Sequence, residues 1–167
     1  MKKLLSVSLV LAMLLVMLAG CNLAEELSKG KQVTSGDLTM TVPALYLDMK
    51  DAVKNDALAF VYGIGDTAVL GVKESRAEVL AALPDVDTAM EYAEIYVKAN
   101  KVDADVTEKD GIITFTYKAS SGGHEFTYLC GVFANDTNFW VVQTYCYTEE
   151  FTKNEADFWD ILKSVKV

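Results

Sequence analysis

The sequence predicts an α+β fold, in which a mostly antiparallel sheet of about six strands is flanked by two helices. Six segments resemble strands, because they alternate polar with apolar residues or are rich in β-branched and aromatic residues. Two segments repeat their apolar residues at helical spacing instead. The connections between strands are too short for the crossovers that a parallel sheet requires. With apolar residues on both faces of the sheet, these features indicate a sandwich.

Three strands are expected first. Residues 37–42 alternate polar and apolar residues and end at Pro43, which has no amide hydrogen to donate to a neighbouring strand. Residues 57–62 and 67–72 are apolar runs, and residues 63–66 between them contain two glycines and an aspartate, as turns do. We therefore expect these two runs to form a β-hairpin.

A helix is expected over residues 87–100, with Asp85 or Asp87 capping its start. Its apolar face is formed by Ala89, Tyr92, Ala93, Tyr96 and Ala99, with Met90 and Val97 beside them. Such a broad apolar face is typical of a helix that packs against a core.

Three further strands are expected at residues 111–118, 125–133 and 139–147. The first alternates apolar with polar residues, and Asp110-Gly111 before it favours a hairpin turn. The other two carry apolar residues on both faces, so we expect them in the centre of the sheet, covered on both sides.

The last helix has the clearest start signal. Residues 152–155 fit a capping box, and Phe151 is placed to pack onto Ala156 as a hydrophobic staple. The expected buried stripe of this helix consists of Phe158, Ile161, Leu162 and Val165.

The first 20 residues have the layout of a signal peptide: two lysines, an apolar run and small residues directly before Cys21. The apolar run is shorter than the ~20 residues that span a membrane, and a polar segment follows it. Residues 18–21, Leu-Ala-Gly-Cys, resemble the lipobox of bacterial lipoproteins, whose cysteine sulfur carries a lipid with acyl chains such as palmitate. An ordinary secretory peptide with a cysteine near its cleavage site is the alternative.

This resemblance implies a chain in three parts. Residues 1–20 are a signal peptide, residues 21–36 are a polar lipidated tether, and residues 37–167 are a single α+β domain. Lipid on Cys21 would anchor the domain to the extracytoplasmic face of the cell membrane. Cleavage would leave 147 residues and would move the net charge from −9 to about −11. Such an acidic chain lacks the basic footprint of a nucleic-acid-binding protein.

The two remaining cysteines, Cys130 and Cys146, could pair in an exported protein or remain as buried thiols. If residues 135–138 close a simple hairpin, Cys130 faces Gln143 and Cys146 faces Thr127. The two sulfurs then lie on opposite faces of the sheet. A bulge or an odd-length loop would return them to one face and permit a disulfide.

No residue is assigned to a catalytic, cofactor-binding or metal-binding role. The single histidine, His124, follows a loop and is expected at the exposed start of a strand. The sequence contains no phosphate-binding glycine loop, no paired-cysteine zinc spacing and no serine elbow. The residues considered for a binding groove, with core packing as the alternative, are Tyr92, Tyr96, Trp140, Tyr145, Tyr147 and Trp159.

Three stretches resemble the PsbP-like family of small α/β sandwich domains: residues 38–43 (LTMTVP), 139–144 (FWVVQT) and 158–166 (FWDILKSVK). The family's usual Gly-Trp after the proline is replaced by Ala44-Leu45. The family is a scaffold for binding and assembly without a shared catalytic constellation, so the resemblance implies a non-enzymatic interaction or assembly module of the cell envelope. Its partner would be another envelope protein. The alternative is a small-ligand-binding lipoprotein with an aromatic groove; an enzyme is the third hypothesis.

Overall fold

The structure is a computed structural model that describes residues 30–53 and 55–167. The predicted signal peptide, Cys21 and most of the tether lie outside the described residues. Across the residues that the structure describes, no helix combines the length and the apolar character needed to cross a membrane.

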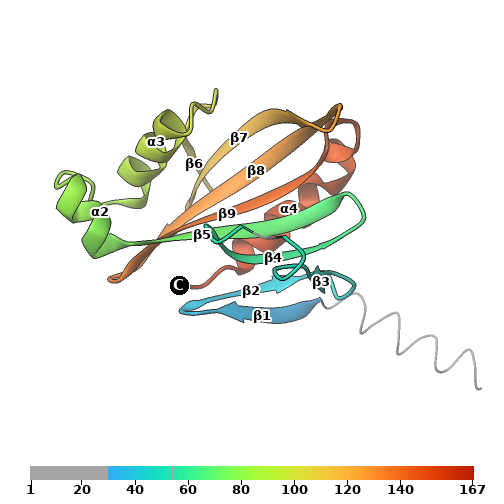
Figure 1. The fold of residues 1–167 in the computed structure, drawn as a ribbon, viewed down its shortest axis with the longest axis horizontal. Coiled ribbons are helices and arrows are strands. Elements are labelled where there is room, and N and C mark those ends of the chain that lie inside the picture. Colours follow the sequence, from blue (N-terminus) through green and yellow to red (C-terminus); the bar gives the residue numbers. More distant parts are fainter. Residues whose placement is uncertain (1–29, 54) are drawn as a thin grey trace, which may run out of the picture.

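The fold is α+β, as predicted, and its strands form two antiparallel sheets (Figure 1). The elements are β1 (Lys31–Ser35), β2 (Leu38–Val42), β3 (Leu47–Asp48), β4 (Leu58–Ile64), β5 (Thr67–Ser75), α2 (Arg76–Ala82), α3 (Ala89–Ala99), β6 (Thr107–Lys109), β7 (Ile112–Ser121), β8 (His124–Ala134), β9 (Asn138–Tyr147), a 3₁₀ helix (Thr148–Glu150) and α4 (Phe151–Ser164). The main sheet has seven strands in the order β3-β4-β5-β9-β8-β7-β6, and β1 pairs with β2 in a separate two-stranded sheet.

The predicted hairpins are confirmed. Strands β4 and β5 pair from Ile64 opposite Thr67, with a two-residue turn between them. Strands β6 and β7 are joined by Asp110 and Gly111, whose φ angles are both positive, as a type I′ turn requires. Strands β8 and β9 were expected in the centre, and β9 lies between β5 and β8 while β8 lies between β9 and β7.

Each face of the main sheet has its own core, because different elements cover the two faces. One core lies beneath α4 and the β1–β2 hairpin and includes Leu38, Met40, Phe60, Trp140, Val142, Phe158, Ile161 and Leu162. The other lies beneath α2 and α3 and includes Val86, Tyr92, Ala93, Val97, Phe115, Cys130, Val132, Phe139 and Val141. The buried stripe expected on the last helix is thus confirmed, with Val165 packed at its edge.

The number of elements differs from the expectation of about six strands and two helices. Strands β3 and β6 are edge strands of two and three residues, too short to give a sequence pattern. Strand β1 lies within residues 21–36, the predicted tether, where Gly36 has a φ of +59° that permits the turn into β2. Helix α2 was not expected; it has seven residues and none of them is buried.

Both predicted helix starts are corrected. Helix α3 is capped by Thr88 rather than Asp85 or Asp87, and Thr88 exchanges hydrogen bonds with Glu91 in a capping box. Helix α4 begins at Phe151 and has no side-chain cap. The 3₁₀ helix before it leads straight into α4, so Thr152 already lies inside the helix.

Candidate functional site

The residues considered for chemistry do not converge. His124 is exposed at the start of β8, as predicted, and its ring lies 5.0 Å from that of Tyr147. Cys130 lies six positions further along β8, or about 20 Å away at the usual rise of a strand. Cys146 is opposite Thr127 on β9, with its side chain on the other face of the sheet.

The register predicted for the two cysteines is confirmed. Cys130 pairs with Gln143 and belongs to the core beneath α3, whereas Cys146 belongs to the core beneath α4. Both are free and buried, and burial raises the pKa of each thiol. A disulfide between them is therefore not formed in this fold. No group of three potential ligands that could hold a metal ion occurs within residues 30–53 and 55–167.

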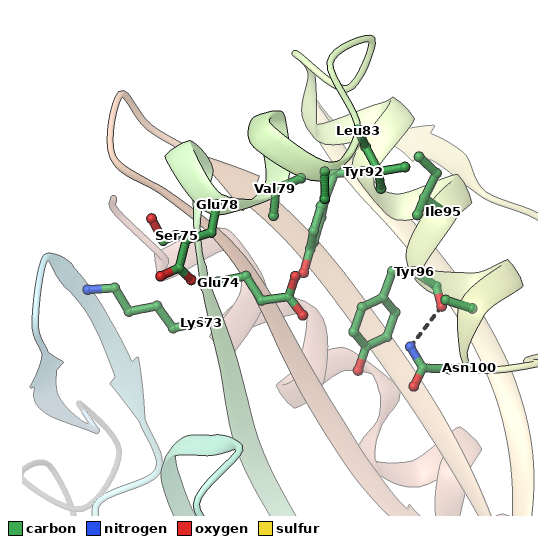
Figure 2. Close-up of a pocket in the computed structure, with 12 residues that line it drawn as sticks. Lys73, Glu74, Ser75, Glu78, Val79, Leu83, Tyr92, Ile95, Tyr96 and Asn100 are labelled. Atoms are coloured by element: carbon green, nitrogen blue, oxygen red, sulfur yellow. Dashed lines mark hydrogen bonds between the residues drawn. The ribbon is translucent and has the colours of Figure 1, made fainter.

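A pocket of about 370 Å³ lies between α2, α3 and the end of β5 (Figure 2). Its lining residues are Lys73, Glu74, Ser75, Glu78, Val79, Ala82, Leu83, Tyr92, Ile95, Tyr96, Ala99 and Asn100. Apolar side chains from α2, α3 and Leu83 form the walls, and two carboxylates line the pocket, Glu74 from β5 and Glu78 from α2. We refer to it as the α2–α3 pocket.

Arg76 holds the two helices in place around this pocket. It donates hydrogen bonds to the backbone oxygens of Asn135 at 3.1 Å and Asp87 at 2.6 Å, and it forms an ion pair with the Asp87 carboxylate. Its guanidinium group lies over the ring of Phe139 at 5.3 Å. The first residue of α2 thereby connects the start of α3 to the β8–β9 turn.

Hydroxyl and carboxylate groups meet inside the pocket. The Glu74 carboxylate points toward the Tyr92 hydroxyl (Figure 2), and burial together with this negative charge raises the pKa of Tyr92. The Tyr92 ring is held from behind by Phe139, with ring centroids 4.4 Å apart and an interplanar angle of 6°. Asn100 donates to the backbone oxygen of Tyr96 at 2.8 Å, which closes the far end of the pocket.

The pocket carries uncompensated negative charge. Lys73 points out of the pocket (Figure 2) and forms a 3.1 Å ion pair with Asp37, and Arg76 forms an ion pair with Asp87. Glu74 and Glu78 are exposed and form no ion pair with any residue that the structure describes. Lys73 and Arg76, the cations nearest to Glu74 in the sequence, are therefore already paired elsewhere.

Gln143 marks the boundary of the helix-covered region. Its amide nitrogen donates to the Tyr96 hydroxyl at 3.2 Å, and its amide oxygen accepts a hydrogen bond from the Tyr117 hydroxyl at 2.9 Å. Gln143 is only 6% exposed, so both polar ends are satisfied by these two tyrosines. Beyond it, the same face of the sheet is no longer covered by α3.

This uncovered part exists because α3 is much shorter than the strands beneath it. Its 11 residues extend about 16 Å, whereas the 11 residues of β8 extend about 36 Å. Figure 1 shows α2 and α3 together over one end of the sheet, with the far ends of β7, β8 and β9 beyond them. We call this region the open aromatic face.

A continuous series of rings fills the open aromatic face. Tyr117 and Tyr128 are stacked with centroids 4.6 Å apart, and Tyr128 and Tyr145 follow at 5.0 Å. Phe126 lies 5.9 Å from Tyr145 and 4.9 Å from Tyr147. All five side chains are half-buried, and each comes from β7, β8 or β9.

The predicted groove residues are therefore divided among several places. Tyr92 and Tyr96 line the α2–α3 pocket, and Tyr145 and Tyr147 lie on the open aromatic face. Trp140 is fully buried in the opposite core, and Trp159 lies on α4 beneath the Lys109 ammonium group, 4.2 Å from its ring centre. Sequence reasoning missed the acidic residues and the α2 residues of the pocket. The sequence signal that could have predicted α2 was the helix-favouring composition of residues 76–82.

Comparison with known proteins supports the fold. No protein-family model matches the chain, and no curated protein sequence matches it significantly. The cyanobacterial PsbP protein CyanoP from Synechocystis sp. PCC 6803 aligns with a TM-score of 0.53 at 11% identity, over 82% of this chain and 91% of its own. A protein from Bacteroides thetaiotaomicron aligns with a TM-score of 0.54 at 10% identity, over 83% of this chain. The chain spans about half of that protein, 48% of its length.

These similarities define the class of fold and nothing finer. Mog1 also aligns, with a TM-score of 0.49 at 11% identity, over 82% of this chain and 95% of its own. At such low identity the common feature is the backbone arrangement. The chain has a PsbP-like α+β sandwich fold, as its sequence resemblance implied.

Proposed function

We propose that the chain is a membrane-anchored, extracytoplasmic lipoprotein whose domain is a non-enzymatic docking module for another protein of the cell envelope. The observation that carries the proposal is the open aromatic face, where stacked tyrosines occupy the part of the sheet that α3 leaves uncovered. A row of half-buried aromatic side chains on a rigid sheet is unusual for a surface without a partner.

The orientation of the rings favours a protein partner. The planes of Tyr117 and Tyr128 differ by only 7° across neighbouring strands, so the two rings stand side by side with their faces against each other. A ligand approaching the sheet then meets ring edges and hydroxyl groups rather than free ring faces. Tyrosine edges of this kind supply apolar contact area and hydrogen bonds with little loss of side-chain entropy, as protein interfaces require.

The proposed anchor limits where the partner lies. The residues between Cys21 and Lys31 can reach at most about 35 Å even when fully extended. A lipid on Cys21 would therefore keep Lys31, where the domain begins, within about 35 Å of the membrane surface. The partner we propose is another protein at that surface.

Site-directed photocrosslinking of the full chain in its membrane tests this function. Replacing Tyr145 with p-benzoylphenylalanine should capture one defined envelope protein, and Tyr128→Ala should weaken that capture. The same probe at Thr152, which is exposed on α4 on the other side of the molecule, is the matched control. Equal capture from both positions, or no reproducible partner from Tyr145, would contradict the docking proposal.

The anchor is tested separately. Cys21→Ser should abolish acyl labelling of the chain and release it from the membrane fraction. Labelling that persists in this variant would refute the lipobox interpretation. The docking proposal does not depend on this result, because the crosslinking experiment reads out a different surface.

A second function is favoured by the α2–α3 pocket. It is concave, has apolar walls and contains a few convergent polar groups, as sites for small molecules do. The small-ligand alternative thus places its aromatic groove between helix and sheet, with Tyr92 and Tyr96 in the wall.

A further inference from the structure

We infer that the α2–α3 pocket is a binding site for a small organic cation that has an apolar body, such as an aryl-alkyl amine. This inference deepens the small-ligand alternative, on which it rests, and names the chemistry of its ligand. It goes beyond protein docking, because the pocket lies under the helices and the open aromatic face lies beyond them.

The sign of the ligand charge follows from the ion pairs around the pocket. Lys73 is bound by Asp37, and Arg76 is bound by Asp87, so neither of these cations is available to neutralise the pocket. The carboxylates of Glu74 and Glu78 remain without an ionic partner among the described residues. An anionic ligand would be repelled by both, and a cation would be attracted.

The aromatic residues add to this preference for a cation. Tyr92 and Tyr96 present their rings in the pocket wall, with centroids 6.2 Å apart and an interplanar angle of 43°. The Tyr92 ring is only 4% exposed and is rigid, because Phe139 stacks against one of its faces. The half-buried ring of Tyr96 is therefore the one that a positive group in the pocket can contact.

An apolar body on the ligand is required by the remaining walls. Val79 on α2 and Leu83 directly after α2 face Ile95 on α3 across the pocket (Figure 2), and Leu83 is 41% exposed. A ligand that covers these side chains removes apolar surface from water. The volume of about 370 Å³ lies at the lower end of the range for small-molecule sites, so it admits a ligand of about the size of phenethylamine.

Three probes of nearly the same shape separate the contributions of charge and shape. Phenethylamine is cationic, 2-phenylethanol is neutral and phenylacetate is anionic. Each is titrated into the isotope-labelled full chain in detergent micelles, and amide chemical shifts report both affinity and location. Phenethylamine should shift the amide signals of Glu74, Val79 and Ile95. It should bind about fivefold more tightly than 2-phenylethanol, and phenylacetate should not bind.

Matched variants assign the charge preference to the pocket. Glu74→Gln should weaken phenethylamine binding by about fivefold, as expected for one partly exposed charge contact, and should leave 2-phenylethanol binding unchanged. Glu78→Gln provides a second acidic position. Glu94→Gln removes the same charge from α3 outside the pocket lining and should leave all three affinities unchanged.

Each contrary outcome overturns the inference. These outcomes are equal binding of the amine and the alcohol, shifts outside the pocket, amine affinity unchanged in both the Glu74 and the Glu78 variants, or no binding of any probe. The last outcome would also refute the small-ligand alternative. The docking proposal is tested separately, by the crosslinking experiment at Tyr145.

Discussion

Asp37→Asn should detach the β1–β2 hairpin from the main sheet more than any other conservative change in that turn. The Asp37 carboxylate accepts hydrogen bonds from the side-chain amides of Asn135 at 2.6 Å and Asn138 at 2.8 Å, and it forms an ion pair with Lys73 at 3.1 Å. These contacts join the β1–β2 turn to the β8–β9 turn and to β5. The variant keeps the shape of the side chain but places a donor group where two other donors point.

The expected loss follows from these contacts. Each of the two amide bonds contributes about 1 kcal/mol to the free energy of unfolding. The Lys73 and Asp37 side chains are 35% and 30% exposed, so solvent screening reduces their ion pair to about 0.5 kcal/mol. The sum of about 2.5 kcal/mol corresponds to a fall in Tm of roughly 9 °C for a domain of this size.

The effect should depend on pH in one direction. The hydrogen bond from Asn135, followed by those from Asn138 and Lys73, holds the pKa of Asp37 well below its usual range despite the opposing effect of burial. A carboxylate with a lowered pKa in the folded state stabilises the fold fully above its unfolded pKa of about 3.9. That stabilisation is lost as the pH falls through the folded pKa.

Thermal denaturation of the full chain in detergent, followed by circular dichroism at pH 6, 4 and 2, checks this prediction. The difference in Tm between the original chain and the variant should be largest at pH 6 and should become smaller below pH 4. Asp136→Asn is the matched control, because Asp136 is exposed in the neighbouring turn and makes no described hydrogen bond or ion pair. A Tm difference that is absent at pH 6, or as large at pH 2 as at pH 6, would refute the reasoning.

Three further predictions test the packing. Cys130 and Cys146 should remain unreactive toward a thiol reagent until the chain is denatured, and a disulfide between them in a mass spectrum would show that the register is wrong. Thr88→Ala should lower the free energy of unfolding in a urea titration by about 1 kcal/mol, because it removes the capping box of α3; an unchanged midpoint would contradict that role. Gly71→Ala should cost about 2 kcal/mol, because the new methyl group would lie 2.2 Å from the Phe60 ring. Truncating that ring with Phe60→Leu should make the glycine substitution less costly, and equal costs in both backgrounds would exclude the clash.

The hairpins β4–β5 and β8–β9 and their register were predictable because they depend on local turns. A four-residue turn at residues 135–138 fixes every pair of β8 and β9, so the opposite placement of Cys130 and Cys146 follows from counting. The same reasoning predicted Asp110 and Gly111 as a turn. In both cases the deciding residues lie next to each other in the sequence.

The helix starts and the pocket depended on information that the local sequence does not carry. Thr88 competes for the cap of α3 with two aspartates of similar capping preference, and the path of the preceding loop decides between them. Helix α2 is too short to show a period, and its position follows from Arg76 reaching Asn135 on a distant turn. The pocket contains α2 residues, so it could not be predicted without that helix.

The open aromatic face left a signal in β9 that sequence reasoning passed over. On the face of β9 toward α4, the side chains of Trp140, Val142, Thr144 and Cys146 are all fully buried. On the other face the series is Phe139, Val141, Gln143, Tyr145 and Tyr147, which changes from fully buried to half-buried. The change falls at Gln143, where α3 stops covering the sheet. The change from buried to half-buried side chains along this face of β9 therefore shows where α3 ends above the sheet. Under the proposed docking function, a partner would bind beyond that point.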